Sequence, residues 1–371
     1  MIVKLRLYHF DLQLRHPFTI SRETITTQPT FIVELQMDGV SGYGEATANP
    51  YYGRDVDGML RLLKKNQSKI ETANWGHPAE LWETLEQDLR TDTFAQCALD
   101  QAAYDLWGKR EQKSVFRLLG WQEDTPRPKS NYTLGIDTPA KIAEKLAEFP
   151  DWPVYKIKLG RGNDIATLRH LKELTSARLR VDANGGWSLA EAAAIAPRLP
   201  EYNVELIEQP LHANDIHAIP KLKESTNLPL IADESCLVPA DVKQCADAGF
   251  DGINIKLVKC GGMTPALEMM TEARKLKLKV MMGCMTESTV GISAIAQLLP
   301  GLDFVDMDGA TLLAEDIAQG VQLKQGQCSY PELIMGNGVH GLRTDLAIQA
   351  TISTCTCSSR GSFVDSERGV A

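Results

Sequence analysis

Three acidic residues each end or directly follow a short apolar run of the chain. Asp182 ends RLRVD, Glu208 ends VELIE, and Asp233 follows PLIA. Each run has the length and composition of a buried strand, so each carboxylate emerges from a core. Three such carboxylates brought together are costly to bury without a cation, and their oxygens suit Mg²⁺, or Mn²⁺ as the alternative, better than Zn²⁺. The competing interpretation is that each acid only caps the helix after it.

Two other runs carry lysines that could work beside such a cation. VYKIKLG contains Lys156 and Lys158, which face the same way because side chains alternate along a strand. GINIK ends at Lys256. As the second and sixth strands of an eight-stranded barrel, the two runs would lie opposite each other, with a lysine on each face of a substrate. One lysine could remove a proton from carbon and the other could return one, unless these lysines reach solvent instead.

The elements that would position these groups recur at a regular spacing. From residue 131 onward, β-branched runs alternate with helical patterns, and the runs end near Gly135, Leu159, Asp182, Glu208, Asp233, Lys256, Gly283 and Asp306. Successive ends lie 23 to 27 residues apart, about one β-α unit, and eight units close a barrel. We therefore predict an α/β fold with a (β/α)7β TIM-like barrel. A doubly wound open sheet is disfavoured, because no glycine-rich phosphate motif follows any run.

The N-terminal part of the chain has a different pattern. Alternating runs predict strands at 2–14 and 30–37, Gly and Pro predict a loop at 39–54, and helical patterns follow at 56–70, 79–89 and 94–109. These segments indicate an α+β capping domain, which a C-terminal segment would complete. We expect the cap over 1–125, the catalytic barrel over 126–325, the segment returning to the cap over 326–350, and a loosely ordered tail over 351–371.

Composition limits the classes of partner and the cell compartment. The chain has 371 residues, a formal net charge of −9 and no Lys/Arg-rich run, which argues against a nucleic-acid partner. It contains no apolar run of signal-peptide or membrane-span length, and its eight scattered cysteines form no pair of CxxC motifs. We therefore expect a cytoplasmic protein with reduced thiols and no membrane partner. A homo-oligomer is left open.

Several motifs resemble those of a known superfamily. KIK, DANGGW, EQP, ADES and NIKLVKCGG, in this order and spacing, are similar to the motifs of the enolase superfamily and its muconate-lactonizing-enzyme-like subgroup. The resemblance runs from about residue 2 to residue 346. It implies that the three acids bind Mg²⁺, that Lys158 and Lys256 are the acid/base catalysts, and that Lys156 binds carboxylate and tunes Lys158. A lysine or histidine base working with magnesium is the general pattern of this superfamily.

The last of the eight runs, LDFVDMDGA, carries two further acids. Asp306 and Asp308 are two residues apart and face the same way. The eighth strand lies across the barrel from the fourth, so these acids would meet the end of a substrate far from the metal, where two carboxylates suit an ammonium group. This DxD resembles that of the dipeptide epimerases, in which it binds the substrate's N-terminal ammonium. The alternative is that one aspartate caps the next turn.

Two residues outside these runs extend the resemblance, and a third departs from it. Arg22, in the loop HPFTISRETIT, lies where L-Ala-D/L-Glu epimerases carry an arginine. This implies pairing with a side-chain carboxylate of the second residue, and a solvent-facing arginine is the alternative. Thr133 in NYTLG is also expected to face the site. In MMGCMTES, Cys284 stands where relatives usually have serine.

Together these residues predict a magnesium-dependent dipeptide epimerase, an isomerase of murein peptide metabolism. It would move a proton at the α-carbon of the C-terminal residue of L-Ala-D/L-Glu or a similar dipeptide, through an enediolate and the two lysines. The rivals in the same subgroup are a cycloisomerase, an o-succinylbenzoate synthase and an N-acylamino-acid racemase. A rival of another class is a barrel that binds metal and ligand without turnover.

Overall fold

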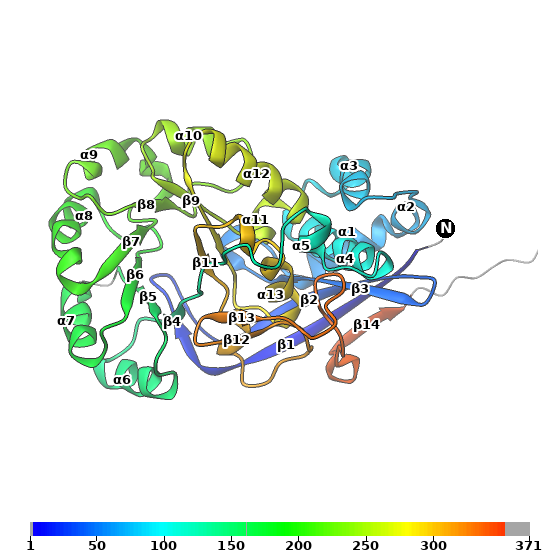
Figure 1. The fold of residues 1–371 in the computed structure, drawn as a ribbon, viewed down its shortest axis with the longest axis horizontal. Coiled ribbons are helices and arrows are strands. Elements are labelled where there is room, and N and C mark those ends of the chain that lie inside the picture. The colour runs from blue at the N-terminus through cyan, green and yellow to red at the C-terminus, as the bar shows by residue number, and fades with distance from the viewer. Residues whose placement is uncertain (1–2, 161, 353–371) are drawn as a thin grey trace, which may run out of the picture.

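The computed structural model describes residues 3–160 and 162–352 and shows a parallel barrel beside a smaller cap (Figure 1). Eight parallel strands form one sheet in chain order: β4 Tyr132–Leu134, β5 Val154–Lys158, β6 Arg178–Asp182, β7 Val204–Glu208, β8 Leu230–Ala232, β9 Gly252–Ile255, β10 Lys279–Gly283 and β11 Phe304–Asp306. A parallel bridge between Ser130 and Val305 joins the two ends of this sheet. The predicted barrel is therefore confirmed, and each strand ends within one residue of its predicted position.

Helices cover the outside of the barrel, as Figure 1 shows. They are α6 Pro139–Glu148, α7 Asp164–Leu174, α8 Leu189–Ile195, α9 Ile219–Lys223, α10 Asp241–Asp247, α11 Leu257–Cys260, α12 Met263–Lys275 and α13 Thr289–Ala296. Because helices cover one face and side chains fill the interior, strands such as β6 and β7 are buried along most of their length. After β11 the chain continues into a 3-10 turn, η5 Gly309–Leu312, and a short hairpin of β12 Gln322–Lys324 and β13 Gln327–Ser329.

The cap is built on a four-stranded antiparallel sheet in the order β14-β1-β2-β3. Its strands are β1 Lys4–Thr19, β2 Thr24–Met37, β3 Val40–Thr47 and β14 Gln349–Ile352, and its helices are α1 Val56–Lys65, α2 Gln67–Thr72, α3 Pro78–Leu89, α4 Thr93–Arg110 and α5 Val115–Leu118. The predicted loop at 39–54 is wrong over the length of β3. Gly42 and Gly44 gave that segment a turn-like composition, but they are there because α4 packs directly on β3, where a Cβ at Gly44 would clash with the Ala98 carbonyl oxygen.

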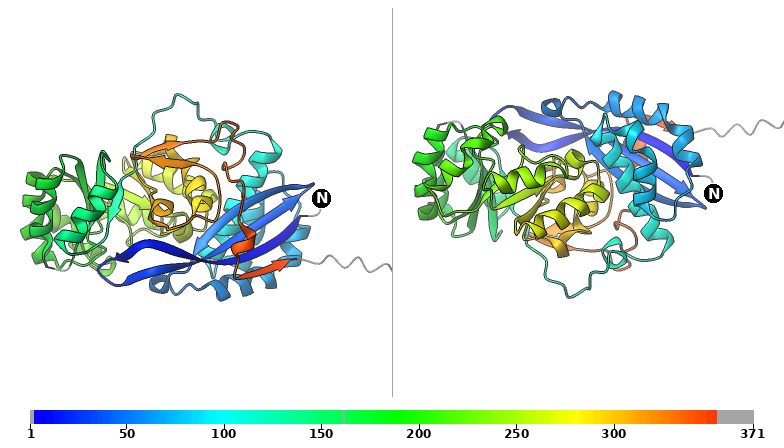
Figure 2. Two further views of the ribbon diagram at one scale, coloured as in Figure 1. Left: turned by 90° about the horizontal axis from the view of Figure 1, so that it is seen from below. Right: turned by 90° about the horizontal axis from the view of Figure 1, so that it is seen from above.

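The hairpin of β1 and β2 extends from the cap to the barrel, as Figure 2 shows in blue. Both strands are longer than predicted, so Arg22 lies in a short turn between them rather than in a long loop. At the tip, the Thr19 carbonyl oxygen accepts a hydrogen bond from Ile136 N at 2.8 Å, just after β4. The hairpin therefore carries cap residues to the end of the barrel.

Buried carboxylates hold the cap against the barrel. Glu45 of β3 accepts hydrogen bonds from Ser288 Oγ at 2.6 Å and from Gly291 N at 3.0 Å, at the start of α13. Asp100 of α4 accepts from Thr264 N at 2.9 Å and from Thr264 Oγ1 at 2.8 Å, at the start of α12. Helix N-termini favour negative charge, so both contacts stabilise the junction.

The segment after the barrel returns to the cap, where β14 pairs antiparallel with β1. The predicted tail lies outside the described residues from 353 onward, and the proposed domain boundaries stay a prediction. Among the helices in the described part of the chain, none has the length and apolarity needed to cross a membrane.

Candidate active site

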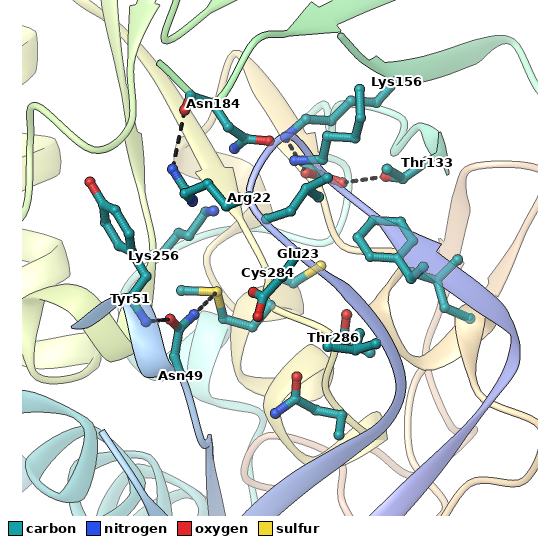
Figure 3. Close-up of a pocket in the computed structure, with 18 of the residues that line it drawn as sticks. Arg22, Glu23, Asn49, Tyr51, Thr133, Lys156, Asn184, Lys256, Cys284 and Thr286 are labelled. Carbon is teal, nitrogen blue, oxygen red and sulfur yellow. Dashed lines mark hydrogen bonds and ion pairs between the residues drawn. The ribbon is translucent and has the colours of Figure 1, made fainter. Parts of the chain in front are cut away.

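The carboxyl ends of the barrel strands open into a cavity. The cap hairpin contributes Arg22 and Phe18 to its lining, and the barrel contributes Lys158 and Lys256. Figure 3 shows Arg22 and Lys256 on one side of this pocket and Thr133 on the other. The cavity therefore joins residues of both parts of the molecule.

Asp182, Glu208 and Asp233 meet at this end of the barrel and form the acid cluster. Asp182 and Glu208 are the last residues of β6 and β7, and Asp233 directly follows β8. Parallel pairing puts Asp182 opposite Glu208, and oxygens of all three carboxylates lie within 4.8 Å of one another. All three side chains are buried. This is a geometry in which carboxylate oxygens can share one divalent cation.

Lys158 and Lys256 lie beside this cluster on opposite sides. Lys158 Nζ lies 2.6 Å from Asp182 Oδ2, and Lys256 Nζ lies 2.9 Å from Asp233 Oδ2. Lys158 ends β5 and Lys256 directly follows β9, and these strands are four places apart in an eight-stranded sheet that closes on itself. Two groups so placed approach a molecule in the middle of the cavity from opposite faces.

Lys156 is a buried neighbour of these lysines. Its Nζ lies 3.1 Å from Asp182, 2.8 Å from Glu208 and 2.8 Å from Asp306. Burial alone would lower the pKa of Lys156, but Asp306, Glu208 and Asp182 together raise it well above its ordinary value. The side chain therefore stays charged and links the acid cluster to Asp306 at the end of β11.

The negative charges of the acid cluster are unevenly compensated. Burial would raise the pKa of Asp182, yet Lys158 and Lys156 lower it to about 2. Burial, then the charge of Asp182, raise the pKa of Glu208 to about 7. Glu208 Oε2 is buried with the Lys156 ammonium 2.8 Å away, and Glu208 Oε1 accepts from Asn254 Nδ2 at 2.8 Å. A further positive charge is favoured at this point, and three oxygen ligands fit Mg²⁺ or Mn²⁺.

Asp306 and Asp308 line the cavity at the end of β11, the strand opposite β7 in the barrel. Asp306 accepts from Asn131 Nδ2 at 2.8 Å, and Asp308 accepts from Thr133 N at 2.5 Å and Thr133 Oγ1 at 3.1 Å. Burial would raise the pKa of Asp306, but Lys156 lowers it, whereas burial and Asp306 raise the pKa of Asp308 well above its ordinary value. Thr133 lines the cavity, and its Oγ1 lies within hydrogen-bond distance of both acids, 3.4 Å from Asp306 Oδ1 and 3.1 Å from Asp308 Oδ1.

Arg22 faces the cavity and already has a carboxylate partner. Both of its terminal nitrogens donate to Glu234 Oε1 at 3.0 Å, and Nη1 also donates to the Asn184 carbonyl oxygen at 3.1 Å. The guanidinium carbon lies 4.0 Å from the centre of the Tyr51 ring. Arg22 therefore lies in the site, as expected, but its partner in the protein is a residue of the barrel.

Three residues at the site were not singled out from the sequence. Lys259 donates to Asp233 Oδ1 at 2.6 Å and to three backbone carbonyl oxygens. Glu234 and Tyr51 hold Arg22 from two sides. Lys259 and Glu234 lie within NIKLVKCGG and ADES, so their place in those motifs was the signal that could have identified them. Tyr51 had no comparable signal.

The structure defines the surroundings of two residues that follow β10, Cys284 and Glu287. Cys284 lines the cavity, where burial, then Asp306 and Asp308, raise the pKa of its thiol well above the ordinary value. Glu287 is buried and accepts from Met285 N at 3.0 Å, and burial raises its pKa in the same way. Both groups are therefore held toward their neutral forms.

Two regions of the chain match models of known protein families. Residues 2–120 match the family model described as mandelate racemase / muconate lactonizing enzyme, N-terminal domain, and residues 140–341 match the one described as enolase C-terminal domain-like. The chain belongs to the mandelate racemase and muconate lactonizing enzyme family. The two matched regions of this family member correspond to the cap and the barrel, and the predicted resemblance to the enolase superfamily is confirmed.

Individual members of the mandelate racemase and muconate lactonizing enzyme family match nearly the whole chain. The L-Ala-D/L-amino acid epimerase of Flavobacterium johnsoniae is 48% identical and covers 91% of this chain and 99% of its own. The L-Ala-D/L-Glu epimerase of Bacteroides thetaiotaomicron is 35% identical, with 89% and 86% covered. A crystal structure of the dipeptide epimerase from Cytophaga hutchinsonii, complexed with Mg and the dipeptide D-Ala-L-Val, superposes with a TM-score of 0.87 at 25% identity and covers 95% of this chain and 100% of that one.

Proposed function

We propose that the protein is a magnesium-dependent dipeptide epimerase, which inverts the α-carbon of the C-terminal residue of L-Ala-D/L-Glu or a similar dipeptide. The observation that carries the proposal is the placement of Lys158 and Lys256 on opposite sides of the cavity, each beside a member of the acid cluster. The names of the Flavobacterium, Bacteroides and Cytophaga relatives, all epimerases, support it.

Asp182, Glu208 and Asp233 would hold the Mg²⁺. Their burial, the closeness of their carboxylate oxygens and the raised pKa of Glu208 all fit a small divalent cation. When bound, Mg²⁺ supplies positive charge that stabilises the negative charge developing on the substrate carboxylate as the α-proton leaves. The Mg in the complex of the Cytophaga relative agrees with this choice of metal.

Lys158 and Lys256 would each exchange a proton with the α-carbon. Removal by one lysine and return by the other inverts the configuration, because the two approach opposite faces. Asp182 orients Lys158 and Asp233 orients Lys256 by direct ion pairs. The two lysine side chains are only 9% and 10% exposed, so bulk water has little access to the reacting carbon.

Asp306 and Asp308 would bind the α-ammonium of the first residue. Both line the cavity, and charge-assisted hydrogen bonds to an ammonium group suit a pair of carboxylates. The substrates of a cycloisomerase or an o-succinylbenzoate synthase have no ammonium group, so Asp308 would gain no cationic partner from them. The proposed contact between these two aspartates and an ammonium group therefore favours a dipeptide substrate over the substrates of those rivals.

Proton NMR of the purified protein with Mg²⁺ and L-Ala-L-Glu in D₂O tests the proposal. We expect the Glu α-proton signal to disappear while L-Ala-D-Glu appears. Chelation of the metal should stop both changes, and added Mg²⁺ should restore them. No exchange with any of a panel of dipeptides, in protein shown to bind Mg²⁺, would overturn the proposal in favour of the cycloisomerase, synthase or binding-only alternatives.

A cytoplasmic location is the second part of the proposal. It is supported by the six cysteines in the described part of the chain, all of which are free thiols. Fractionation of the source cells should find the epimerase activity in the cytoplasmic extract. Recovery of the activity in a membrane or extracellular fraction would contradict this location.

A further inference from the structure

We propose that Glu234 is a specificity-determining residue, which neutralises Arg22 so that the site accepts a dipeptide with an uncharged second side chain and does not select an acidic one. This inference rests on the proposed function, because it concerns the substrate class of the same site. An unpaired Arg22 would favour the opposite choice, a glutamate side chain held by its guanidinium.

The Arg22–Glu234 pair lies at the metal end of the cavity. Glu234 directly follows Asp233 in the chain, and Arg22 also donates to the carbonyl oxygen of Asn184, two residues after Asp182. In the proposed function, the dipeptide's carboxylate lies at the metal and its ammonium at Asp306 and Asp308, so its second residue lies at this end. The second side chain therefore meets the ion pair.

The charge of Arg22 is already compensated within the protein. Two charge-assisted hydrogen bonds of 3.0 Å join Arg22 to Glu234 Oε1, and the Glu234 side chain is only 4% exposed. Tyr51 covers the guanidinium at 4.0 Å. A substrate carboxylate would have to compete with a buried partner, and its arrival would leave an excess negative charge at a poorly hydrated place.

The second oxygen of Glu234 indicates what the site can accept. Oε2 is buried without a hydrogen-bond partner in the described part of the chain, and Glu234 lines the cavity. A buried acceptor of this kind is satisfied by a donor, which an amide side chain carries and an ionised carboxylate lacks. The hairpin adds Phe18, Ile20 and Ile25 to the lining, which suits an apolar stem. Glutamine combines both properties.

Two dipeptides competing in one reaction test the proposal. The probes are L-Ala-L-Gln and L-Ala-L-Glu, and the measured quantity is the ratio of their kcat/KM values for α-proton exchange in D₂O, Gln over Glu. The ratio cancels any loss of folded or metal-loaded protein, which matters because Glu234 adjoins Asp233. We expect a ratio of about one or more in the wild type. A wild-type ratio far below one would overturn the proposal.

Charge-changing variants at the two positions separate the proposed role from direct binding by Arg22. Glu234→Gln frees the guanidinium and should lower the ratio about tenfold, whereas Arg22→Gln leaves Glu234 without its cationic partner and should raise the ratio about tenfold. The double variant restores the net charge, so its ratio should return to within about threefold of the wild-type value.

If Arg22 instead binds the side-chain carboxylate of the substrate directly, the ratios of the variants should differ from these. The double variant would then keep the raised ratio of Arg22→Gln, and Glu234→Gln alone would change little, which would overturn the role of Glu234. Failure of the proposed function is distinguishable from this result, because neither dipeptide would then exchange its α-proton in any of the proteins.

Discussion

The barrel and the cap bring residues to the site by different physical routes. The barrel places its charges at strand ends one β-α unit apart, so the register of neighbouring strands, such as Asp182 opposite Glu208, brings them together. The cap places Arg22 at the turn of one hairpin, where it meets Glu234, 212 positions away in the chain. The difference indicates that proton transfer depends on the strand register of the barrel, whereas selection of the side chain depends on the length and position of one hairpin.

The largest effect should come from the barrel lysines. Lys158→Ala or Lys256→Ala should lower the rate of epimerisation by about 10²–10⁴-fold, because either change removes one of the two proton carriers. NMR in D₂O measures the rate, and each variant should still exchange the α-proton of the one epimer that faces its remaining lysine. Lys243→Ala, an exposed lysine paired with Asp247, is the matched control and should keep the wild-type rate. Unchanged epimerisation in either site variant would exclude the two-lysine mechanism.

Removing Glu45, one of the two carboxylates described at the junction of cap and barrel, should have the next largest effect, a loss of stability. Glu45→Ala leaves Ser288 and the Gly291 amide without their acceptor, which should lower the free energy of unfolding by about 3 kcal/mol. Urea unfolding followed by fluorescence measures the change. Glu83→Ala, at an exposed position of α3, is the control and should change it by less than about 0.5 kcal/mol. Equal stabilities for both variants would mean that Glu45 does not hold the cap.

The far side of the barrel should show a smaller effect that depends on the substrate. Asp308→Asn keeps an acceptor for Thr133 N but removes the carboxyl group that would ionise against the substrate's ammonium, so kcat/KM for the free dipeptide should fall by about 10–100-fold. Acetylation of the substrate's amino group should cost the wild type a similar factor and the variant much less, as kinetics with both substrates would measure. Equal losses on acetylation in the two proteins would show that Asp308 does not bind the ammonium.

The smallest effect concerns the pH dependence of the junction. Burial raises the pKa of Asp100 from 3.8 to about 7, so between these values the folded protein binds a proton that the unfolded chain has lost. Stability from this group therefore falls as pH rises from about 4 to 7. Over that pH range, the free energy of unfolding should fall by about 1–3 kcal/mol less in Asp100→Asn than in the wild type. Urea unfolding at each pH measures this difference. Parallel pH profiles for the two proteins would contradict the raised pKa.

The sequence predicted the barrel well because one signal, the spacing of strand ends, fixes its strands and its charged residues together. It failed at β3, where Gly42 and Gly44 have the composition of a turn but serve close packing on α4. It also left the partner of Arg22 unknown. That contact depends on how far β1 and β2 extend, and their hydrophobic alternation weakens toward the tip, where the strands leave the core and become half-exposed.

The pairing of β14 with β1 has a consequence for the order in which the molecule is made. The ribosome delivers β1 early, yet the neighbour of its outer edge arrives only with residues 349–352. Until then, the edge of β1 exposes unpaired backbone groups that another chain could join. A chain stopped before residue 349 would keep this open edge permanently, so premature termination should produce self-association in addition to lost activity.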